Sequence, residues 1–203
     1  NSKLFIFGKK YPIKNLNLNN IQKENLECAI ACALAINISP NKIIKSLENL
    51  KPVPGRFEEI KYNKKLSKII IDYAHSPDAI KNILQIYKRK NVKASIVFGC
   101  GGERDKYKRK EMGIIAQKFA NKVYLTDDNP RNENPDKIRQ DVKKYCPKAI
   151  EIADRRKAIE TAILQINNQD ILIIAGKGHE KYQLIKNKKI IFDDYEIVKK
   201  FIK

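Results

Sequence analysis

Charged and amide side chains crowd into residues 127–131 (DDNPR), directly after a short apolar segment. Two carboxylates, an amide and a guanidinium occupy these five positions, which is more than a simple turn requires. Arg131 could form a bidentate pair with a carboxylate, while Asp128 or Asn129 could receive an ammonium group. These are the two charged groups of a zwitterionic amino acid, so the pattern predicts a binding site for one.

A second segment, residues 98–106 (FGCGGERDK), places three glycines beside Arg104. Glycines allow the backbone to come close to a ligand, and exposed N–H groups in such a turn attract anions. The guanidinium of Arg104 matches a carboxylate or a phosphate. We expect an anion-binding loop here, and a merely flexible glycine-rich turn is the alternative.

Residues 72–78 (DYAHSPD) end in a helix start, because the Ser-Pro-Asp sequence supplies a cap, a proline for the first helical position and an acid for the helix dipole. Capping does not explain Asp72 and His75. Two interpretations of Asp72 and His75 remain: they bind a ligand, or they belong to an ordinary strand-to-helix junction.

Residues 176–180 (GKGHE) look like a phosphate loop at first sight. The Walker pattern requires a glycine, four residues and then Gly-Lys-Ser or Gly-Lys-Thr, and none of the eight glycines begins such a run. The two histidines, His75 and His179, have no Cys or acidic partner at ligand spacing. We therefore expect no metal site.

The elements expected to position these segments alternate between strands and helices. Two helices, over residues 22–36 and from Pro40 onward, precede a break at residues 51–55 (KPVPG), and we place a domain boundary near residue 58. Beyond it we expect strands over residues 68–74, 94–98, 122–126, 149–152 and 171–175, and helices over residues 77–89, 108–120, 135–145, 155–167 and from Tyr195.

This order predicts an α/β fold, namely a mostly parallel, Rossmann-like sheet flanked by helices on both faces. Two further strands, over residues 182–186 and 189–192, form a carboxy-terminal hairpin that we expect to add an antiparallel edge to the sheet. Sheets of this kind bind ligands beyond the carboxyl ends of their strands. The polar segments described above are expected to meet there.

The chain carries 42 Lys and Arg against 23 Asp and Glu, a formal net charge of +19. A basic nucleic-acid-binding module is therefore one hypothesis. The lysines are spread without an Arg-rich arm or interleaved aromatic residues, which favours small anionic ligands instead. The apolar runs are far too short to cross a bilayer. The four cysteines show no paired framework, so we expect reduced thiols, with Cys28 and Cys32 in a core.

Five segments together resemble one family, the Mur ligases, in their order and spacing. They are residues 53–58 (VPGRFE), 72–78 (DYAHSPD), 98–105 (FGCGGERD), 128–131 (DNPR) and 176–180 (GKGHE). Residues 128–131 resemble the motif of the members that add meso-diaminopimelate to UDP-N-acetylmuramoyl-L-alanyl-D-glutamate. The resemblance spans nearly the whole chain and implies an ATP-dependent acid–amino-acid ligase of peptidoglycan biosynthesis that works through an acyl phosphate.

The resemblance also implies roles for individual residues. Diaminopimelate would be held with its distal carboxylate on Arg131 and its distal ammonium on Glu180. The full set implied for this amino acid is Arg104, Asp128, Asn129, Pro130, Arg131, Gly176 and Glu180. The nucleotide would be bordered by Arg56 near its phosphates and by His75 and Asp78 near its adenosine. No catalytic residue and no metal ligand are expected in this chain.

By the same resemblance, residues 1–57 would be the end of a central ATPase domain, with helical structure, and residues 58–203 the whole carboxy-terminal, amino-acid-binding domain. The chain begins with Asn1, so we expect its native start to be missing. The resemblance implies that the UDP-binding domain and the phosphate loop are absent from it, so we expect the chain alone to be inactive. ATP and Mg²⁺ would serve the intact enzyme, which we expect to be a cytoplasmic monomer without nucleic-acid or membrane partners. A relative that adds lysine, D-glutamate or a D-alanyl dipeptide, or a folylpolyglutamate synthase, is the alternative.

Overall fold

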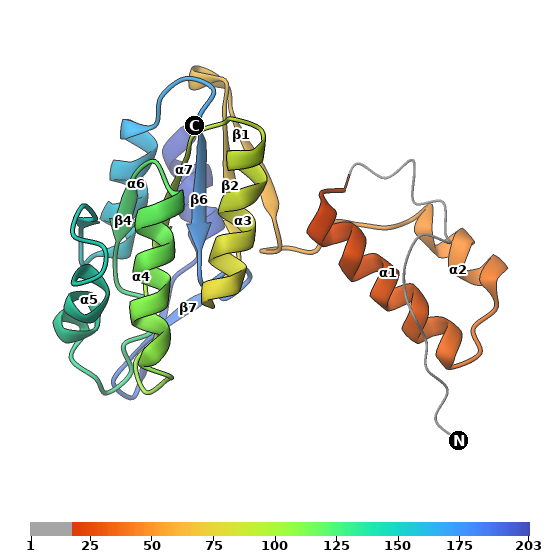
Figure 1. Cartoon of the computed structure of the whole chain (residues 1–203), viewed down its shortest axis with the longest axis horizontal. Coiled ribbons are helices and arrows are strands. Elements are labelled where there is room, and N and C mark those ends of the chain that lie inside the picture. Colours follow the sequence, from red (N-terminus) through yellow and green to blue (C-terminus); the bar gives the residue numbers. More distant parts are fainter. Residues whose placement is uncertain (1–17) are drawn as a thin grey trace. The chain divides into compact units, whose positions relative to one another are not determined.

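A computed structural model describes residues 18–203 of the chain (Figure 1). The chain divides into two compact units, one that ends at Lys51 and one that spans Pro52–Lys203. The part of the predicted segment 1–57 that precedes residue 18 lies outside the described residues. The assignment of the first unit to an ATPase domain stays a prediction.

The first unit contains two helices, α1 (Asn20–Ala35) and α2 (Pro40–Leu47). A capping box starts α1, because the Asn19 side chain accepts from the backbone N–H of Gln22 and the Gln22 side chain accepts from that of Asn19. Proline at the first position starts α2. The two helices were expected from the sequence, and their buried residues pack into one small cluster.

The second unit is built on a six-stranded sheet with the order β1-β2-β6-β3-β4-β5. The strands are β1 (Glu58–Tyr62), β2 (Ser67–Asp72), β3 (Ala94–Phe98), β4 (Val123–Leu125), β5 (Ile150–Glu151) and β6 (Ile171–Ala175). The helices are the short 3-10 helix η1 (Asn63–Lys65), α3 (Pro77–Arg89), α4 (Tyr107–Phe119), α5 (Pro135–Lys143), α6 (Arg155–Gln165) and α7 (Asp194–Ile202). Within residues 18–203, none of the helices has the length and apolar character needed to cross a membrane.

Buried residues of α3, α4 and α5 form one core on the first face of the sheet, and those of α6 and α7 form a second core on the opposite face. Strands β3 and β6 are buried at every position because they lie between both helix layers. In Figure 1, α3 and α4 lie in front of β6 while α7 lies behind it. The predicted α/β class with a mostly parallel sheet is confirmed.

One strand and one edge were predicted wrongly. Strand β1 was not expected, and it pairs antiparallel with β2 as the edge of the sheet. Its sequence, EEIKY, buries only Ile60 and Tyr62, so its signal is the weak alternation of a half-buried edge. The predicted hairpin exists as β7 (Tyr182–Ile185) and β8 (Lys188–Ile191), but it forms a separate two-stranded sheet.

The cysteine prediction is half wrong. Cys28 and Cys32 are exposed on α1, whereas Cys100 and Cys146 are buried in the second unit. Burial raises the pKa of Cys100 to about 12, and the nearby Asp128 carboxylate acts in the same direction. Helical spacing in an Ala-rich segment therefore indicated the helix but not the buried face.

A fully buried ion pair joins the two helices on the second face. Arg155 of α6 donates from Nε and Nη2 to the two carboxylate oxygens of Asp194 on α7, at 2.9 and 2.7 Å. Its Nη2 also donates to the carbonyl oxygen of Ala175, the last residue of β6, at 2.9 Å. Both side chains have no exposed area. The pair therefore fixes α6 and α7 at the end of β6, where the segment 176–180 begins.

We expect Asp194→Asn to lower the free energy of unfolding by about 3 to 5 kcal/mol, because it leaves the Arg155 charge buried without its partner. Urea unfolding followed by circular dichroism measures this change. Glu59→Gln is the control, since its ion pair with Lys68 is half-exposed and contributes about 1 kcal/mol or less. Equal effects of the two substitutions would show that the buried pair does not fix the helices.

Candidate functional site

Four loops and the start of β1 come together at one edge of the sheet. Strands β2, β3, β4 and β6 are parallel, so the segments that follow them leave at the same edge. Strand β1 runs the other way and pairs Glu58 with Ile71, which brings residues 55–57 to that edge as well. A cavity of about 520 Å³ lies there. Among the predicted site residues, its lining contains His75, Arg104, Asp128, Asn129, Arg131, Gly176 and Glu180.

The glycine-rich segment packs against the segment after β4. A Cβ atom at Gly102 would lie 2.0 Å from the carbonyl oxygen of Pro130, so only glycine fits. The N–H of Gly102 donates to the carbonyl oxygen of Asn129 at 2.9 Å. This N–H is therefore not free for an anion, and the glycine serves the contact between two loops rather than the predicted anion site.

Arg109 of α4 forms hydrogen bonds to residues in both of these loops. Its Nη2 donates to Glu133 at 2.8 Å and to the carbonyl oxygen of Gly101 at 3.4 Å, and its Nη1 donates to Asp141 at 2.9 Å. Burial lowers the pKa of Arg109, but the ion pairs with Glu133 and Asp141 outweigh it and raise the pKa overall. Only 2% of its side chain is exposed, so this charge supports the loops and has little access to a ligand.

The hairpin has a function in the site that the sequence did not indicate. The Gln183 side chain of β7 donates to the carbonyl oxygen of Asp128 at 2.9 Å, and the backbone N–H of Leu184 donates to the Asn129 side chain at 2.9 Å. The backbone of Arg131 forms a bridge to the end of β7, with φ of 52°. The hairpin thus clamps residues 128–131 in their conformation, including the left-handed one of Arg131.

The guanidinium of Arg131 is oriented by backbone carbonyl groups. Its Nη1 donates to the carbonyl oxygen of Gly102 at 2.8 Å and, at 3.4 Å, to that of Asn129. Among the described residues, none accepts from its Nε or Nη2. This edge of the guanidinium is the one that can bind a carboxylate through two parallel hydrogen bonds.

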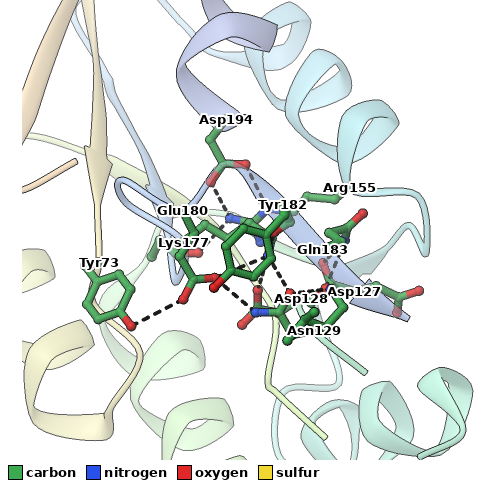
Figure 2. Close-up of polar contacts among 12 residues, drawn as sticks. Tyr73, Asp127, Asp128, Asn129, Arg155, Lys177, Glu180, Tyr182, Gln183 and Asp194 are labelled. Carbon is green, nitrogen blue, oxygen red and sulfur yellow. Dashed lines mark hydrogen bonds and ion pairs between the residues drawn. The ribbon is translucent and has the colours of Figure 1, made fainter. Parts of the chain in front are cut away.

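A buried lysine stands at the centre of the polar contacts (Figure 2). Lys177 has no exposed side-chain area, and its Nζ donates to the side-chain oxygen of Asn129 and to the carbonyl oxygen of Tyr182, both at 2.8 Å. The same Nζ lies 3.0 Å from Oδ1 of Asp128 and 3.7 Å from Oε2 of Glu180. The lysine therefore connects the segments after β4 and β6 with the start of β7.

Glu180 receives hydrogen bonds on both carboxylate oxygens. The Asn129 side chain donates to Oε2 at 3.0 Å and the Tyr73 hydroxyl donates to Oε1 at 3.3 Å (Figure 2). Burial and the Glu180 carboxylate both raise the pKa of Tyr73, so its hydroxyl stays protonated and able to donate. The segment after β2 is in this way linked to the segment after β6.

The other predicted residues lie on the side of β2. The Asp72 carboxylate accepts from the backbone N–H of Phe57 at 2.7 Å and from that of Ala74 at 2.8 Å. Asp72 therefore links the segment before β1 to the segment after β2. Burial raises its pKa although both hydrogen bonds act against this. The guanidinium of Arg56 lies over the Tyr73 ring, 4.4 Å from its centroid. Asp78, in the first turn of α3, is exposed and does not line the cavity.

The sequence interpretation missed several residues of this site. Lys177 was considered only as part of a false phosphate loop, and Tyr73, Arg109 and Gln183 were not singled out. For Lys177 the one signal was its place in a strand-end loop at the edge where parallel sheets bind ligands. Gln183 carried no such signal.

Metal ligands do not gather in the part of the chain that the structure describes: no three His, Cys, Asp or Glu residues of residues 18–203 are placed to hold an ion. Two acidic residues of the cavity, Asp128 and Glu180, instead pair with Lys177, which offsets one of their two negative charges.

The mostly parallel sheet is covered by helices on both faces and has a polar cavity of mixed charge at its carboxyl edge, the place where α/β domains of this kind bind ligands. A family model described as "Mur ligase, glutamate ligase domain" matches residues 55–178, more than half of the chain. The chain belongs to the Mur ligase family.

Curated relatives agree with this. The chain is 42% identical over 201 residues to a UDP-N-acetylmuramoyl-L-alanyl-D-glutamate--2,6-diaminopimelate ligase of Rickettsia rickettsii, a match that covers 97% of the chain and 41% of the relative. A protein of the same name from Chelativorans sp. is 41% identical over 197 residues, with 97% and 41% covered. The chain therefore spans about two fifths of the length of these relatives.

Solved structures show the same similarity. A structure of a UDP-N-acetylmuramoyl-L-alanyl-D-glutamate--2,6-diaminopimelate ligase has a TM-score of 0.69 and 38% identity, and it matches 91% of the chain and 39% of its own length. A UDP-N-acetylmuramate-alanine ligase from Thermotoga maritima, with a TM-score of 0.60 and 19% identity over 91% of the chain and 37% of its own, shows the fold alone.

We expect Gly102→Ala to destabilise the second unit by about 1 to 3 kcal/mol, because the new methyl group must displace the backbone at Pro130. Gly101→Ala is the matched control, since its Cβ would meet a side-chain nitrogen of Arg131 at 3.0 Å and no backbone atom closer than 3.8 Å. Thermal unfolding of both variants compares them directly. Equal melting temperatures would contradict the close packing of the two loops.

Proposed function

We propose that this chain is the amino-acid-binding part of an ATP-dependent ligase that adds meso-diaminopimelate to UDP-N-acetylmuramoyl-L-alanyl-D-glutamate. The observation that carries the proposal is the position of two kinds of charge in one cavity. Arg104 and Arg131 supply cations, and Asp128 and Glu180 supply carboxylates. Diaminopimelate has an ammonium and a carboxylate at each end, so its distal end requires both kinds of partner.

The distal carboxylate would bind to Arg131. The free Nε and Nη2 edge offers two parallel hydrogen bonds, and the bond from Nη1 to Gly102 already holds the guanidinium in place. Less conformational freedom is then lost on binding. Arg104 is exposed at the rim of the same cavity and has no partner among the described residues, so it can attract either carboxylate.

The distal ammonium would lie between Glu180 and Asp128. Oδ2 of Asp128 accepts no hydrogen bond from the described residues, and each Glu180 oxygen has capacity for a further donor. The oxygen of the Asn129 side chain already accepts from Lys177 and from Leu184. We therefore propose that Asn129 positions Glu180 and does not itself accept from the ammonium.

In the proposed reaction, ATP phosphorylates the side-chain carboxylate of the D-glutamate residue. The proximal amine of diaminopimelate then attacks the acyl phosphate, an amide bond forms, and ADP and phosphate are released. The residues of this cavity would act by holding the amine in one position, which raises its effective concentration at the acyl phosphate.

The nucleotide and Mg²⁺ would be held mainly by parts of the intact ligase beyond this chain. Arg56, His75 and Asp78 keep their predicted place beside the nucleotide as part of this proposal. Arg56 and His75 both lie against the Tyr73 ring, with the His75 centroid at 4.6 Å, so they form one group at the β2 side of the cavity. We expect the intact enzyme in the cytoplasm, where its proposed nucleotide and nucleotide-linked substrates would be available.

The Arg131 side chain is the feature that distinguishes diaminopimelate from lysine. L-lysine has the distal ammonium but no distal carboxylate, so a free Arg131 edge would stay without a partner. Losing one buried pair of this kind costs about 2 to 5 kcal/mol, roughly 30-fold or more in affinity. A lysine-adding relative would not require this guanidinium.

We expect the chain to bind meso-diaminopimelate in preference to L-lysine, and Arg131→Ala to abolish this preference by weakening diaminopimelate binding roughly 30-fold. Titration followed by two-dimensional NMR measures both affinities, including weak ones. Arg89→Ala is the control, because Arg89 is exposed at the end of α3 and removal of its charge leaves the cavity intact.

The proposal is contradicted if the unaltered chain shows no shift of cavity signals with saturating meso-diaminopimelate. It is also contradicted if the chain binds both amino acids equally well. Tight binding of duplex DNA that weakens steeply with salt would favour the nucleic-acid hypothesis instead.

A further inference from the structure

Lys177 lies behind the cavity, and a ligand cannot reach it directly, since its side chain has no exposed area. An ammonium group has three protons to donate. Two of them are used in the hydrogen bonds to Asn129 and Tyr182, and Oδ1 of Asp128 lies 3.0 Å from Nζ as an ion-pair partner. A buried ammonium charge is costly unless hydrogen bonds and opposite charges compensate it.

The partners of Lys177 are the residues proposed to receive the ammonium end of the ligand. Asp128 and Glu180 contribute two negative charges, and both lie within 4 Å of the same Nζ. The positive charge of Lys177, on the buried side of the two carboxylates, offsets one unit of this charge. The carboxylate pair then carries a net charge of one unit, which matches a single ammonium group and weakens repulsion of a nearby ligand carboxylate.

Lys177 also determines which way the Asn129 amide points. Nζ donates only to an oxygen, so the amide oxygen faces the lysine and the amide nitrogen faces Glu180. The N–H of Leu184 enforces the same orientation. A reversed amide would place its N–H groups against two other donors and its oxygen against a carboxylate.

We propose that Lys177 is a positioning and specificity-determining residue of the amino-acid site. It sets the net charge of the Asp128 and Glu180 pair and fixes the Asn129 amide that holds Glu180. The inference rests on the proposed function, because the preference that it explains is that for a zwitterionic distal end over a cationic one. Without Lys177 the site gains one unit of negative charge, which penalises the distal carboxylate of diaminopimelate but not L-lysine, which has none.

NMR titrations of the chain with meso-diaminopimelate and with L-lysine test this role through two substitutions. We expect Lys177→Met to reduce the ratio of the two affinities, diaminopimelate over lysine, about tenfold or more, because charges at these distances interact strongly away from bulk water. Lys177→Gln keeps a donor for Asn129 without the charge. We expect it to retain the signals of an oriented Asn129 amide while it loses the preference.

Lys181→Met is the matched control. Lys181 has the same charge four positions along the chain, but 80% of its side chain is exposed and its nearest ion-pair partner is Asp193 at 3.9 Å. We expect no change in either affinity. If both Lys177 variants fail to fold, the unaltered chain still decides: protected ammonium signals of Lys177 that shift when meso-diaminopimelate is added support the role, and their absence contradicts it.

The outcomes separate the two proposals. If the unaltered chain does not bind meso-diaminopimelate, the proposed function itself fails. If it does bind, and folded Lys177→Met loses affinity for both amino acids equally or for neither, only the role of Lys177 is refuted. A selective loss for meso-diaminopimelate supports both.

Discussion

The site depends on the cost of burying one lysine charge inside a sheet protein. A buried ammonium must be surrounded by acceptors, since an unpaired charge away from water costs several kcal/mol. Lys177 finds its acceptors on the segment after β4, on its own segment after β6 and at the start of β7. These segments are far apart in sequence, and the need of the Lys177 ammonium for acceptors holds them together. The carboxylates of Asp128 and Glu180, which pair with Lys177, are also the proposed acceptor groups of the cavity.

The rest of the fold makes this arrangement rigid. Four parallel strands end at one edge, and the Arg155 and Asp194 pair holds both helices of the second face at the end of β6. The Gly102 contact and the hairpin fix residues 128–131 from two sides. Arg131 therefore presents its free edge without a large loss of side-chain freedom, as recognition of a planar carboxylate requires.

Much of this could be predicted from sequence, for reasons that differ between elements. The bounds of α3, β3 and β6 match the prediction, because a Ser-Pro start and short, mostly apolar runs between helices are strong signals. Strand β1 was missed because an edge strand buries only alternate residues, and the separate hairpin because pairing partners are long-range. The converging polar loops followed from the parallel sheet, whereas the orientation of Asn129 and the role of Lys177 depend on atomic contacts that no local pattern encodes.

A crystal structure of the chain with meso-diaminopimelate tests the central claim most directly. The account predicts that the distal carboxylate lies on the Nε and Nη2 edge of Arg131 and that the distal ammonium lies within hydrogen-bond distance of Glu180 and Asp128, with Lys177 unmoved behind them. A ligand bound elsewhere on the chain, or in this cavity with its ammonium turned toward Arg131, would contradict it.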